Sequence, residues 1–398
     1  METLIEKCKR KLRLVQTKYV RDVMNKIGWG NRLIAIRGAK GVGKTTLMLQ
    51  YLKMHGCNGV SSLYVTMDDG YFTQHTLIEL ADQFYKRGGH LLMIDEVHKY
   101  VGWSREIKNI YDDYPDLQVV ISSSSLLNIM AGDADLSRRC VPYDIYGLSY
   151  REYLQLAHGI CTEPIELKDL LSQPDDFCNK VTDLCRPLEY FEEYLREGYY
   201  PFVLEDRVSY PLKVENVVNY ILDVELPHLC GVDVGQVRKL KSLLTILADG
   251  VPMQVDISKM STMVEMSRLT LLNHLQYLQR ARLLNLLYSD ENGVKKLQKP
   301  DKIYLENTNL MDALSLSSVN GGTQRETFLV GQMRAAGHRV EYGRCGDVLV
   351  DGQWTIEIGG KHKDGKQIAS VPNAFIAADH LDMPAGNKIP LWAFGFVY

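Results

Sequence analysis

A glycine-rich segment followed by a lysine and two threonines carries the strongest chemical signal in this 398-residue chain. The segment Gly38–Thr45 matches GxxxxGK[ST], in which glycines let backbone N–H groups turn inward around phosphate oxygens. The apolar run Leu33–Arg37 precedes it and a helical apolar pattern follows, so the loop opens a helix N-terminus, which favours negative charge. We expect a nucleotide site formed by Gly38, Ala39, Lys40, Gly41, Val42, Gly43, Lys44, Thr45 and Thr46.

Particular roles follow from the chemistry of this loop. We expect Lys44 to reach the β- and γ-phosphates of ATP and the Thr45 hydroxyl to bind Mg²⁺. A second acid for the metal should end a neighbouring apolar strand, and Asp95 ends the run Leu91–Ile94. Glu96 follows directly and is predicted to polarise the attacking water. The alternative is that both acids only favour the first turn of a helix.

Two further polar groups are candidates for contact with the γ-phosphate. Ser123 lies in a run of four serines at the end of the strand Gln118–Ser122, although these hydroxyls could instead cap the next helix. Arg138 and Arg139 precede another strand. One of them is predicted to stabilise transition-state charge, in cis or from a neighbouring subunit, with a surface ion pair as the alternative. An arginine acting in trans would require a homo-oligomer.

Five apolar runs separated by helical stretches must position these groups. Such alternation predicts an α/β P-loop NTPase core with a parallel five-stranded sheet in the order 5-1-4-3-2 and ligands at its carboxyl edge. The predicted strands are Leu33–Arg37, Leu63–Met67, Leu91–Asp95, Gln118–Ser122 and Val141–Gly147.

These motifs resemble those of a prokaryotic group of AAA-type ATPases that carry a helical lid, a winged helix and a C-terminal restriction-endonuclease-like domain. The resemblance implies ATP hydrolysis but names no biological task. The residues that carry it are Gly38–Thr46, Leu91–Lys99 with Trp103, Ile121–Leu127, Leu136–Leu154 and Arg196–Val203.

The middle of the chain changes its charge. Residues Cys161–Tyr200 contain ten acidic and four basic residues, a net charge of −6, which suits a helical lid or a basic partner better than a phosphate backbone. Residues Gln236–Leu305 contain eleven basic and six acidic residues, a net charge of +5. The order helix–helix–helix–strand–strand in this second region predicts a winged helix.

The third of these helices, Arg268–Ala281, has a leucine stripe, and polar residues are predicted to point away from it. Those residues and the lysines of the wing are the candidates for DNA contact, although a winged helix beside an ATPase can instead only pack against it. The predicted DNA-contacting residues are Arg268, Asn273, His274, Lys295 and Lys296.

A helix with Glu326, then strands with Asp347 and Glu357, resembles the start of a restriction-endonuclease-like core. In such cores two carboxylates bind Mg²⁺ and a lysine two residues after the second acid orients water, because residues i and i+2 of a strand share a face. Here position i+2 is Gly359, so we expect Lys361 to be drawn in by a bulge. The alternative is a degenerate domain kept for binding or assembly, and this sequence favours that alternative.

Composition limits the remaining function classes. Net charge is −3, so any contact with nucleic acid must be local, and none of the eight cysteines forms a CxxC pair that would suggest structural zinc. No run approaches a membrane span and no signal-peptide core is present, so we expect a soluble, cytoplasmic protein without membrane contact. The predicted segments are 1–30 (helical), 31–149 (ATPase core), 150–232 (lid), 233–316 (winged helix) and 317–398 (nuclease-like).

The leading prediction is therefore Mg²⁺-dependent ATP hydrolysis coupled to a winged-helix and nuclease-like module that acts on DNA. Two other functions stay open. One is a nucleotide-gated regulatory protein, such as a stress or defence switch, with little turnover. The other is an ATP-gated nuclease.

Overall fold

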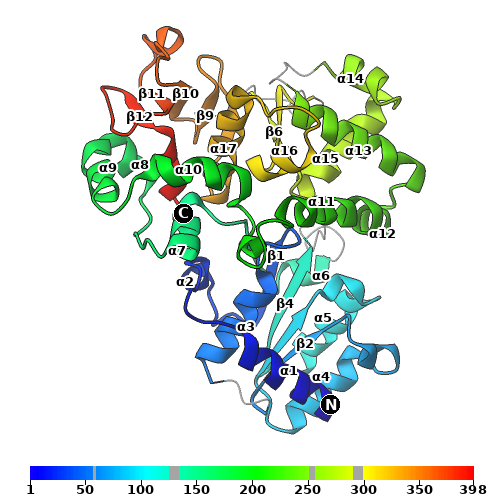
Figure 1. The fold of residues 1–398 in the computed structure, drawn as a ribbon. Helices are drawn as coiled ribbons and strands as arrows, with labels where there is room; N and C mark the ends of the chain where they lie inside the picture. Colours follow the sequence, from blue (N-terminus) through cyan, green and yellow to red (C-terminus); the bar gives the residue numbers. More distant parts are fainter. Residues whose placement is uncertain (57–59, 125–133, 251–255, 290–298) are drawn as a thin grey trace. The chain divides into compact units, whose positions relative to one another are not determined.

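The computed structural model describes residues 1–56, 60–124, 134–250, 256–289 and 299–398. The chain divides into two compact units, Met1–Tyr146 and Gly147–Tyr398. Each unit has its own sheet and its own helices (Figure 1). No described helix has both the length and the apolar character required to cross a bilayer.

A parallel sheet of five strands forms the centre of the first unit. Its strand order is β2-β3-β4-β1-β5, which is the predicted order read from the other edge, and it confirms the P-loop NTPase fold. Because all strands run in parallel, their carboxyl ends meet at one edge, where ligands bind in this class of fold. The strands are β1 (Leu33–Gly38), β2 (Ser62–Thr66), β3 (Leu91–Asp95), β4 (Gln118–Ser124) and β5 (Val141–Asp144).

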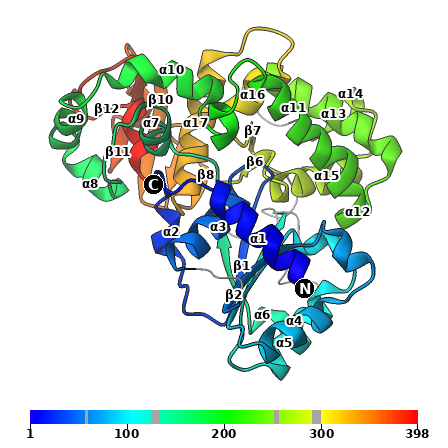
Figure 2. The ribbon, with the colours of Figure 1, turned by 60° about the horizontal axis from the view of Figure 1, so that its bottom comes forward.

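Helices pack against this sheet. The amphipathic helix α1 lies along β2 and α3 in both ribbon views (Figures 1 and 2), and it buries Leu4, Cys8 and Leu12. Helix α4 packs on α5 and begins with a capping box between Thr76 and Glu79. The helices are α1 (Glu2–Leu14), α2 (Val23–Lys26), α3 (Lys44–Met54), η1 (Gly70–Thr73), α4 (Leu77–Lys86), η2 (Val97–Lys99), α5 (Trp103–Asp113) and α6 (Ala134–Ser137).

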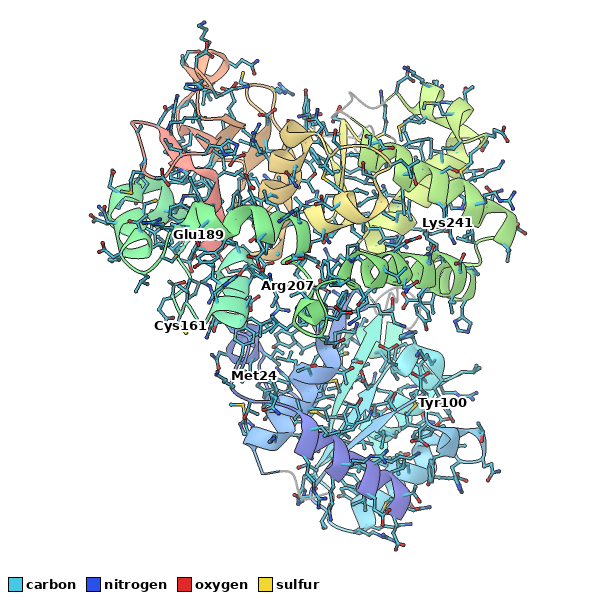
Figure 3. All side chains as sticks on the ribbon, viewed as in Figure 1. Met24, Tyr100, Cys161, Glu189, Arg207 and Lys241 are labelled. Carbon is cyan, nitrogen blue, oxygen red and sulfur yellow. The ribbon has the colours of Figure 1, made fainter. Side chains whose placement is uncertain are left out.

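The second unit begins with helices, as predicted for residues 150–232. The negative charge of residues Cys161–Tyr200 is partly compensated by Arg207 (labelled in Figure 3), which forms ion pairs with Glu193 and Glu197. The elements are α7 (Tyr150–His158), α8 (Leu167–Ser172), α9 (Pro174–Thr182), α10 (Pro187–Glu197), η3 (Pro201–Leu204), α11 (Tyr210–Tyr220), the π-helical η4 (Ile221–Glu225) and α12 (Leu226–Cys230).

The predicted order of three helices and two strands follows. Strands β6 and β7 pair antiparallel, and the leucine stripe of α15 is buried at Leu271, Leu275 and Leu278. This order agrees with a winged helix, which stays a prediction. The elements are α13 (Val234–Asp249), α14 (Ile257–Met263), α15 (Arg268–Arg280), β6 (Leu284–Leu287), β7 (Lys302–Leu305) and the following helix α16 (Thr308–Leu314).

The C-terminal residues form a second five-stranded sheet, in the order β12-β11-β10-β9-β8. Strands β9 and β10 form the predicted hairpin, and Asp351 and Gly352 both have positive φ at its turn. Helix α17 packs against β10. The elements are α17 (Gly321–Ala335), β8 (Val340–Tyr342), β9 (Val348–Val350), β10 (Trp354–Gly360), η6 (Lys366–Ile368), β11 (Ala374–Asp379), β12 (Lys388–Pro390) and η7 (Leu391–Phe396).

The end of the described chain returns to the helices that open the second unit. Trp392 and Phe396 are buried, and the Phe396 ring meets Tyr150 of α7 and Phe177 of α9 edge to face. The segments predicted as lid and nuclease-like domain therefore share a core within this unit. The five predicted segments divide the chain more finely than its two compact units, and their boundaries stay predictions.

Candidate nucleotide-binding site

The loop between β1 and α3 has a backbone that requires glycine. Gly41 and Gly43 have φ values of 88° and 96°, in the left-handed region that L residues rarely adopt. At Gly38 a Cβ atom would lie 2.4 Å from the carbonyl oxygen of Ile145. The glycines at these pattern positions are therefore explained by backbone geometry.

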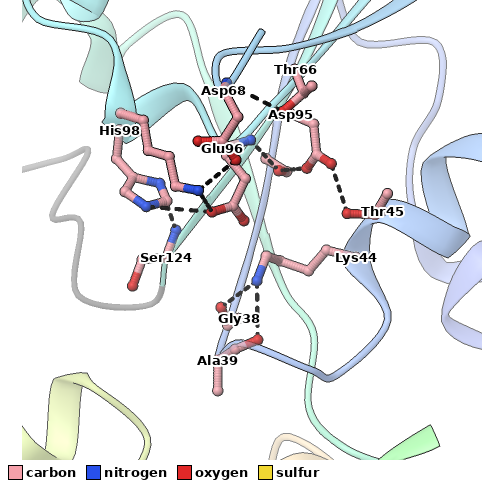
Figure 4. A network of polar contacts seen from close by, with 12 residues as sticks. Gly38, Ala39, Lys44, Thr45, Thr66, Asp68, Asp95, Glu96, His98 and Ser124 are labelled. Atoms are coloured by element: carbon pink, nitrogen blue, oxygen red, sulfur yellow. Dashed lines mark hydrogen bonds and ion pairs between the residues drawn. The ribbon is translucent and has the colours of Figure 1, made fainter. Parts of the chain in front are cut away.

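Lys44 turns back into this loop. Its side chain is almost fully enclosed (6% exposed), and Nζ donates hydrogen bonds to the carbonyl oxygens of Gly38 at 2.8 Å and Ala39 at 3.0 Å (Figure 4). Both of these acceptors are neutral carbonyl oxygens that an anionic ligand could replace. A phosphate group in the loop would be such a ligand.

Thr45 and Asp95 meet at the carboxyl edge of the sheet. Thr45 Oγ1 donates to Asp95 Oδ2 at 2.6 Å, although the two residues lie on different elements, α3 and β3 (Figure 4). Asp95 is 3% exposed. A hydroxyl and a carboxylate at this separation are oxygen donors of the kind that Mg²⁺ prefers, so these residues fit a magnesium ion.

Two residues that the sequence analysis did not single out hold the Asp95 carboxylate. Tyr64 OH donates to Asp95 Oδ2 at 2.6 Å, and Ser122 Oγ donates to Asp95 Oδ1. Burial, and after it the Asp95 charge, raises the pKa of Tyr64 above its ordinary value, so this hydroxyl stays protonated. Neighbouring β2 and β4 thus supply donors that orient the acid at the end of β3.

Glu96 leaves the strand in an unusual conformation. Its φ is 56°, which is uncommon for a residue with a side chain, and its backbone N–H donates to Ser122 Oγ at 2.9 Å. The side chain extends toward Lys99 Nζ at 3.5 Å and His98 Nε2 at 3.6 Å (Figure 4). The carboxylate is therefore only partly buried and has room to face a water molecule.

The serine chosen from the sequence is not the one that contacts the acids. Ser123 is fully buried and its Oγ has no hydrogen-bond partner among the described residues, whereas Ser122 bonds both Asp95 and the Glu96 N–H. Adjacent residues of a strand point to opposite faces, which explains why only one of the two reaches β3. Ser125 lies outside the described residues.

The two arginines differ in their surroundings. Arg139 forms a bidentate ion pair with Asp112, with distances of 3.0 and 3.1 Å, which is the surface pairing considered as the alternative to a γ-phosphate contact. Arg138 is exposed and has no ion pair with another described residue. A contact of either arginine with nucleotide stays a prediction.

The C-terminal carboxylates are paired with lysines, and not with the predicted one. Lys363 Nζ lies 3.0 Å from Glu357 Oε1, and its aliphatic chain covers Gly359, where a Cβ would lie 2.9 Å from Lys363 Cγ and Cδ. Burial alone would lower the pKa of Lys363, but its bond to Glu357 raises it. The prediction of Lys361 was wrong, because Lys361 is exposed and follows the end of β10.

Asp347 lies near this pair, and Glu326 contacts Lys302 of β7. Asp347 Oδ2 accepts from the Ile358 N–H at 2.8 Å, while Lys302 Nζ contacts Asp347 at 3.4 Å and Glu326 at 3.0 Å. No three His, Cys, Asp or Glu side chains in the described part of the chain come together as metal ligands. The predicted metal role of Asp347 and Glu357 stays a prediction.

The predicted DNA-contacting residues divide into two groups. Arg268 and Asn273 are exposed on α15, as expected. His274 is buried and burial lowers its pKa, so the prediction that it points outward was wrong. Lys295 and Lys296 lie outside the described residues.

Comparisons with known proteins agree with this core. A family model described as an AAA domain matches residues 30–154, and a domain of unknown function, DUF8612, matches residues 188–320. The AAA match supports nucleotide binding and hydrolysis at the site described above.

Two curated relatives are described as uncharacterized proteins. One, from Methanocaldococcus jannaschii, is 27% identical over 287 residues, which cover 68% of this chain and 60% of that protein. The other, from Haemophilus influenzae, is 24% identical over 341 residues, which cover 79% of this chain and 78% of that protein.

Two solved structures align with this chain at low TM-scores. AMPPCP-bound DnaA from Aquifex aeolicus has a TM-score of 0.28 and 14% identity, covering 67% of this chain and 92% of that one. PCH-2 from C. elegans has a TM-score of 0.24 and 18% identity, covering 40% of this chain and 45% of that one.

Proposed function

We propose that this protein is a Mg²⁺-dependent ATPase whose nucleotide site lies at the loop Gly38–Thr45. One observation carries the proposal: the Thr45 hydroxyl and the Asp95 carboxylate meet at 2.6 Å beside a buried, inward-turned Lys44. These groups come from two elements, with Lys44 and Thr45 at the start of α3 and Asp95 at the end of β3, and together they match the needs of a bound triphosphate.

The loop residues have distinct tasks in binding. Lys44 exchanges its bonds to the Gly38 and Ala39 carbonyls for phosphate oxygens, and the N–H groups at the start of α3 favour the same negative charge. Thr45 and Asp95 would hold Mg²⁺, which when bound supplies positive charge to the phosphates. The buried Tyr64 and Ser122 hydroxyls keep the Asp95 carboxylate oriented for this role.

Glu96 is the proposed general base. Its position directly after Asp95, at the end of β3, supports this role, and the bond from its N–H to Ser122 fixes the backbone. It accepts a proton from the attacking water as the water oxygen bonds to the γ-phosphorus and the bond from that phosphorus to the β,γ-bridging oxygen breaks, so that ADP is the leaving group. Exposed Arg138, provided by a neighbouring subunit, is the proposed source of transition-state charge in a homo-oligomer.

Replacement of the base tests this assignment. Glu96→Gln should lower the rate of ATP hydrolysis at least about 100-fold while the Kd for ATP stays within about threefold. Glu6→Gln, which changes an exposed glutamate of α1, is the matched control and should leave both unchanged. Turnover by Glu96→Gln at the parental rate would show that the assigned base is wrong.

We also propose that hydrolysis is coupled to the predicted winged helix and to DNA. Support comes from the net charge of +5 over Gln236–Leu305 and from exposed Arg268 and Asn273 on α15. DNA should then stimulate ATP turnover, and Arg268→Ala should weaken the stimulation without changing turnover in the absence of DNA. Turnover that DNA does not affect would contradict this coupling.

A second candidate is a nucleotide-gated regulatory protein with little turnover. It is favoured by the cation beside the proposed base: Lys99 contacts Glu96 at 3.5 Å and is itself held by Asp68 at 2.6 Å. An ion-paired carboxylate is a weaker base, so hydrolysis would be slow. Under this candidate Lys99→Met should accelerate hydrolysis, and slow hydrolysis that is insensitive to DNA would support it over the first proposal.

A third candidate is an ATP-gated nuclease. Support comes from Lys363, which lies 3.0 Å from Glu357 of β10, and from Asp347, which directly precedes β9 and accepts from the Ile358 N–H of β10. Purified protein should then cut DNA or RNA when Mg²⁺ or Mn²⁺ is added, and Asp347→Ala should stop it. An absence of cutting, or cutting that survives Asp347→Ala, would exclude this candidate.

A further inference from the structure

A buried histidine joins the proposed base to the end of strand β4. His98 is 7% exposed and lies in the short helix η2 that follows Glu96. Its Nδ1 accepts a hydrogen bond from the Ser124 backbone N–H at 3.3 Å, and its Nε2 faces Glu96 Oε2 at 3.6 Å (Figure 4). One imidazole ring therefore spans the space between two strand ends.

The Ser124 contact decides which nitrogen carries the proton. Because the Ser124 N–H is a donor, Nδ1 must be unprotonated, and a neutral imidazole then carries its hydrogen on Nε2. Burial lowers the pKa of His98 below its ordinary value, which favours this neutral ring at pH 7. The Nε2–H is thus directed at the carboxylate that is proposed to activate water.

The Nε2–H is an unfilled donor in the described structure. His98 Nε2 is buried and has no hydrogen-bond partner among the described residues, and 3.6 Å to Glu96 is slightly too long for a bond. The Glu96 backbone is fixed by Ser122, so a rotation of its side chain is the movement that can close the gap. Catalytic contacts of this kind are often long before substrate binds.

Glu96 has a competing partner on its other side. Lys99 contacts the same Oε2 atom at 3.5 Å, and Asp68 holds that lysine at the end of β2. The Glu96 carboxylate therefore has two partners. The Lys99 ammonium weakens it as a base, whereas the neutral Nε2–H of His98 does not add a charge. The Ser124 amide determines where the His98 contact lies, because it holds the imidazole ring.

We propose that His98 is a positioning residue that orients the Glu96 carboxylate toward the attacking water and couples that orientation to the carboxyl end of β4. The inference rests on the proposed ATPase function. Strand β4 also contains Ser122 and Ser123, which lie beside the phosphate loop strand β1, so a nucleotide that displaces the end of β4 moves the imidazole and with it the base.

Steady-state kinetics and calorimetry on three variants of the full chain test the proposal. His98→Leu should lower kcat about 10- to 100-fold. The KM for ATP, and the Kd for a non-hydrolysable ATP analogue measured with Mg²⁺ present, should stay within about threefold of the parental values, because no group that binds nucleotide is lost. His98→Gln retains a donor and an acceptor and should recover most of kcat. His90→Leu, a change at an exposed histidine, should have no effect.

A second readout does not depend on turnover. In ¹⁵N-histidine NMR spectra, His98 should appear as the neutral tautomer protonated at Nε2, and its signals should shift when the ATP analogue binds. If thermal melting shows that His98→Leu is unfolded, the NMR measurement of the His98 tautomer and the kcat of His98→Gln still test the positioning role. Adding His98→Leu to Glu96→Gln should lower the residual rate no further, because the base is already removed.

The outcomes separate the two proposals. An unmodified protein that does not hydrolyse ATP, or Glu96→Gln at the parental rate, would overturn the proposed function itself. An active protein in which His98→Leu keeps the parental kcat, or in which His98 is protonated at Nδ1, would overturn the positioning role alone.

Discussion

Thr45 Oγ1 and Asp95 Oδ2 lie 2.6 Å apart, although 50 positions separate the two residues in the chain. The contact exists because β3 lies two strands from β1 in a parallel sheet, so the end of β3 and the start of α3 open on the same edge. The protein itself assembles the pair of oxygen atoms that we propose as ligands of Mg²⁺. The proposed chemistry depends on this pairing.

Removing the negative charge of Asp95 should uncouple nucleotide binding from magnesium. Asp95→Asn should weaken ATP binding about tenfold in the presence of Mg²⁺ and leave the weaker binding in EDTA unchanged, because Lys44 and the loop remain. Thr45→Ser keeps the hydroxyl and is the control. Equal affinities of Asp95→Asn and the parent with Mg²⁺, measured by calorimetry, would contradict the metal assignment.

Tyr64 should contribute to stability through its bond to Asp95. Tyr64→Phe removes a buried hydroxyl that donates at 2.6 Å, and it should lower the free energy of unfolding by about 1 kcal/mol. Tyr51 is a suitable comparison, because its ring stacks on Trp29 and His55 outside this network. Urea denaturation should show a smaller loss for Tyr51→Phe, and the reverse order would argue against a structural role for the Tyr64 hydroxyl.

Glu306 should make the stability of the second unit depend on pH. Its side chain is 3% exposed, and burial raises its pKa to about 7 in the folded chain, against an ordinary value of 4.5. Between pH 4.5 and about 7 the Glu306 carboxyl group is ionised in the unfolded chain but still protonated in the folded chain. The folded state therefore binds more protons, and the free energy of unfolding falls as pH rises through this range. The shift corresponds to a loss of about 3 kcal/mol, complete above pH 7.

Glu306→Gln cannot ionise and should lack this loss. Relative to the parent, the variant should be more stable at pH 8 than at pH 5 when unfolding is followed in urea. Glu215→Gln, at an exposed position of α11, controls for the general effect of charge removal. A stability difference between Glu306→Gln and the parent that is equal at both pH values would show that Glu306 does not titrate as stated.

Lys363 and Lys361 should differ sharply although they are two residues apart. Lys363→Met removes the partner of Glu357, which is 1% exposed and has a second oxygen without a hydrogen bond, so it should cost about 1–3 kcal/mol of stability. Lys361→Met changes an exposed residue and should cost less than about 0.5 kcal/mol. Equal melting temperatures of the two variants would contradict the Lys363–Glu357 pair.

The phosphate loop and its sheet could be predicted because their signals are local. The glycine spacing determines the loop, and apolar runs that end in Gly38 and Asp95 identify the strands that position the acids. The choice among consecutive serines could not be predicted, since a shift of one residue reverses the face of a strand. Tyr64 and His98 were missed because their hydrogen bonds join residues on different strands or strand ends, which no local sequence pattern reveals.

Two errors had different physical origins. His274 lies three residues after Leu271 and four before Leu278, on the buried stripe of α15, so helical spacing alone could have placed it inside. Lys361 was expected from strand alternation, but β10 ends at Gly360, and the turn that follows brings Lys363 back over Gly359. The alternation of side chains along a strand cannot be extended to residues that follow the turn at its end.

Calorimetric titration of the protein with a non-hydrolysable ATP analogue and Mg²⁺ tests the central claim most directly. The parent should bind one nucleotide per chain, and Lys44→Ala should lose at least about tenfold in affinity, because a buried charged donor is removed from the loop. Lys26→Ala, at an exposed position of α2, should stay within about threefold. Equal affinities for the parent and Lys44→Ala, or no binding by the parent, would contradict the claim that this loop holds a triphosphate.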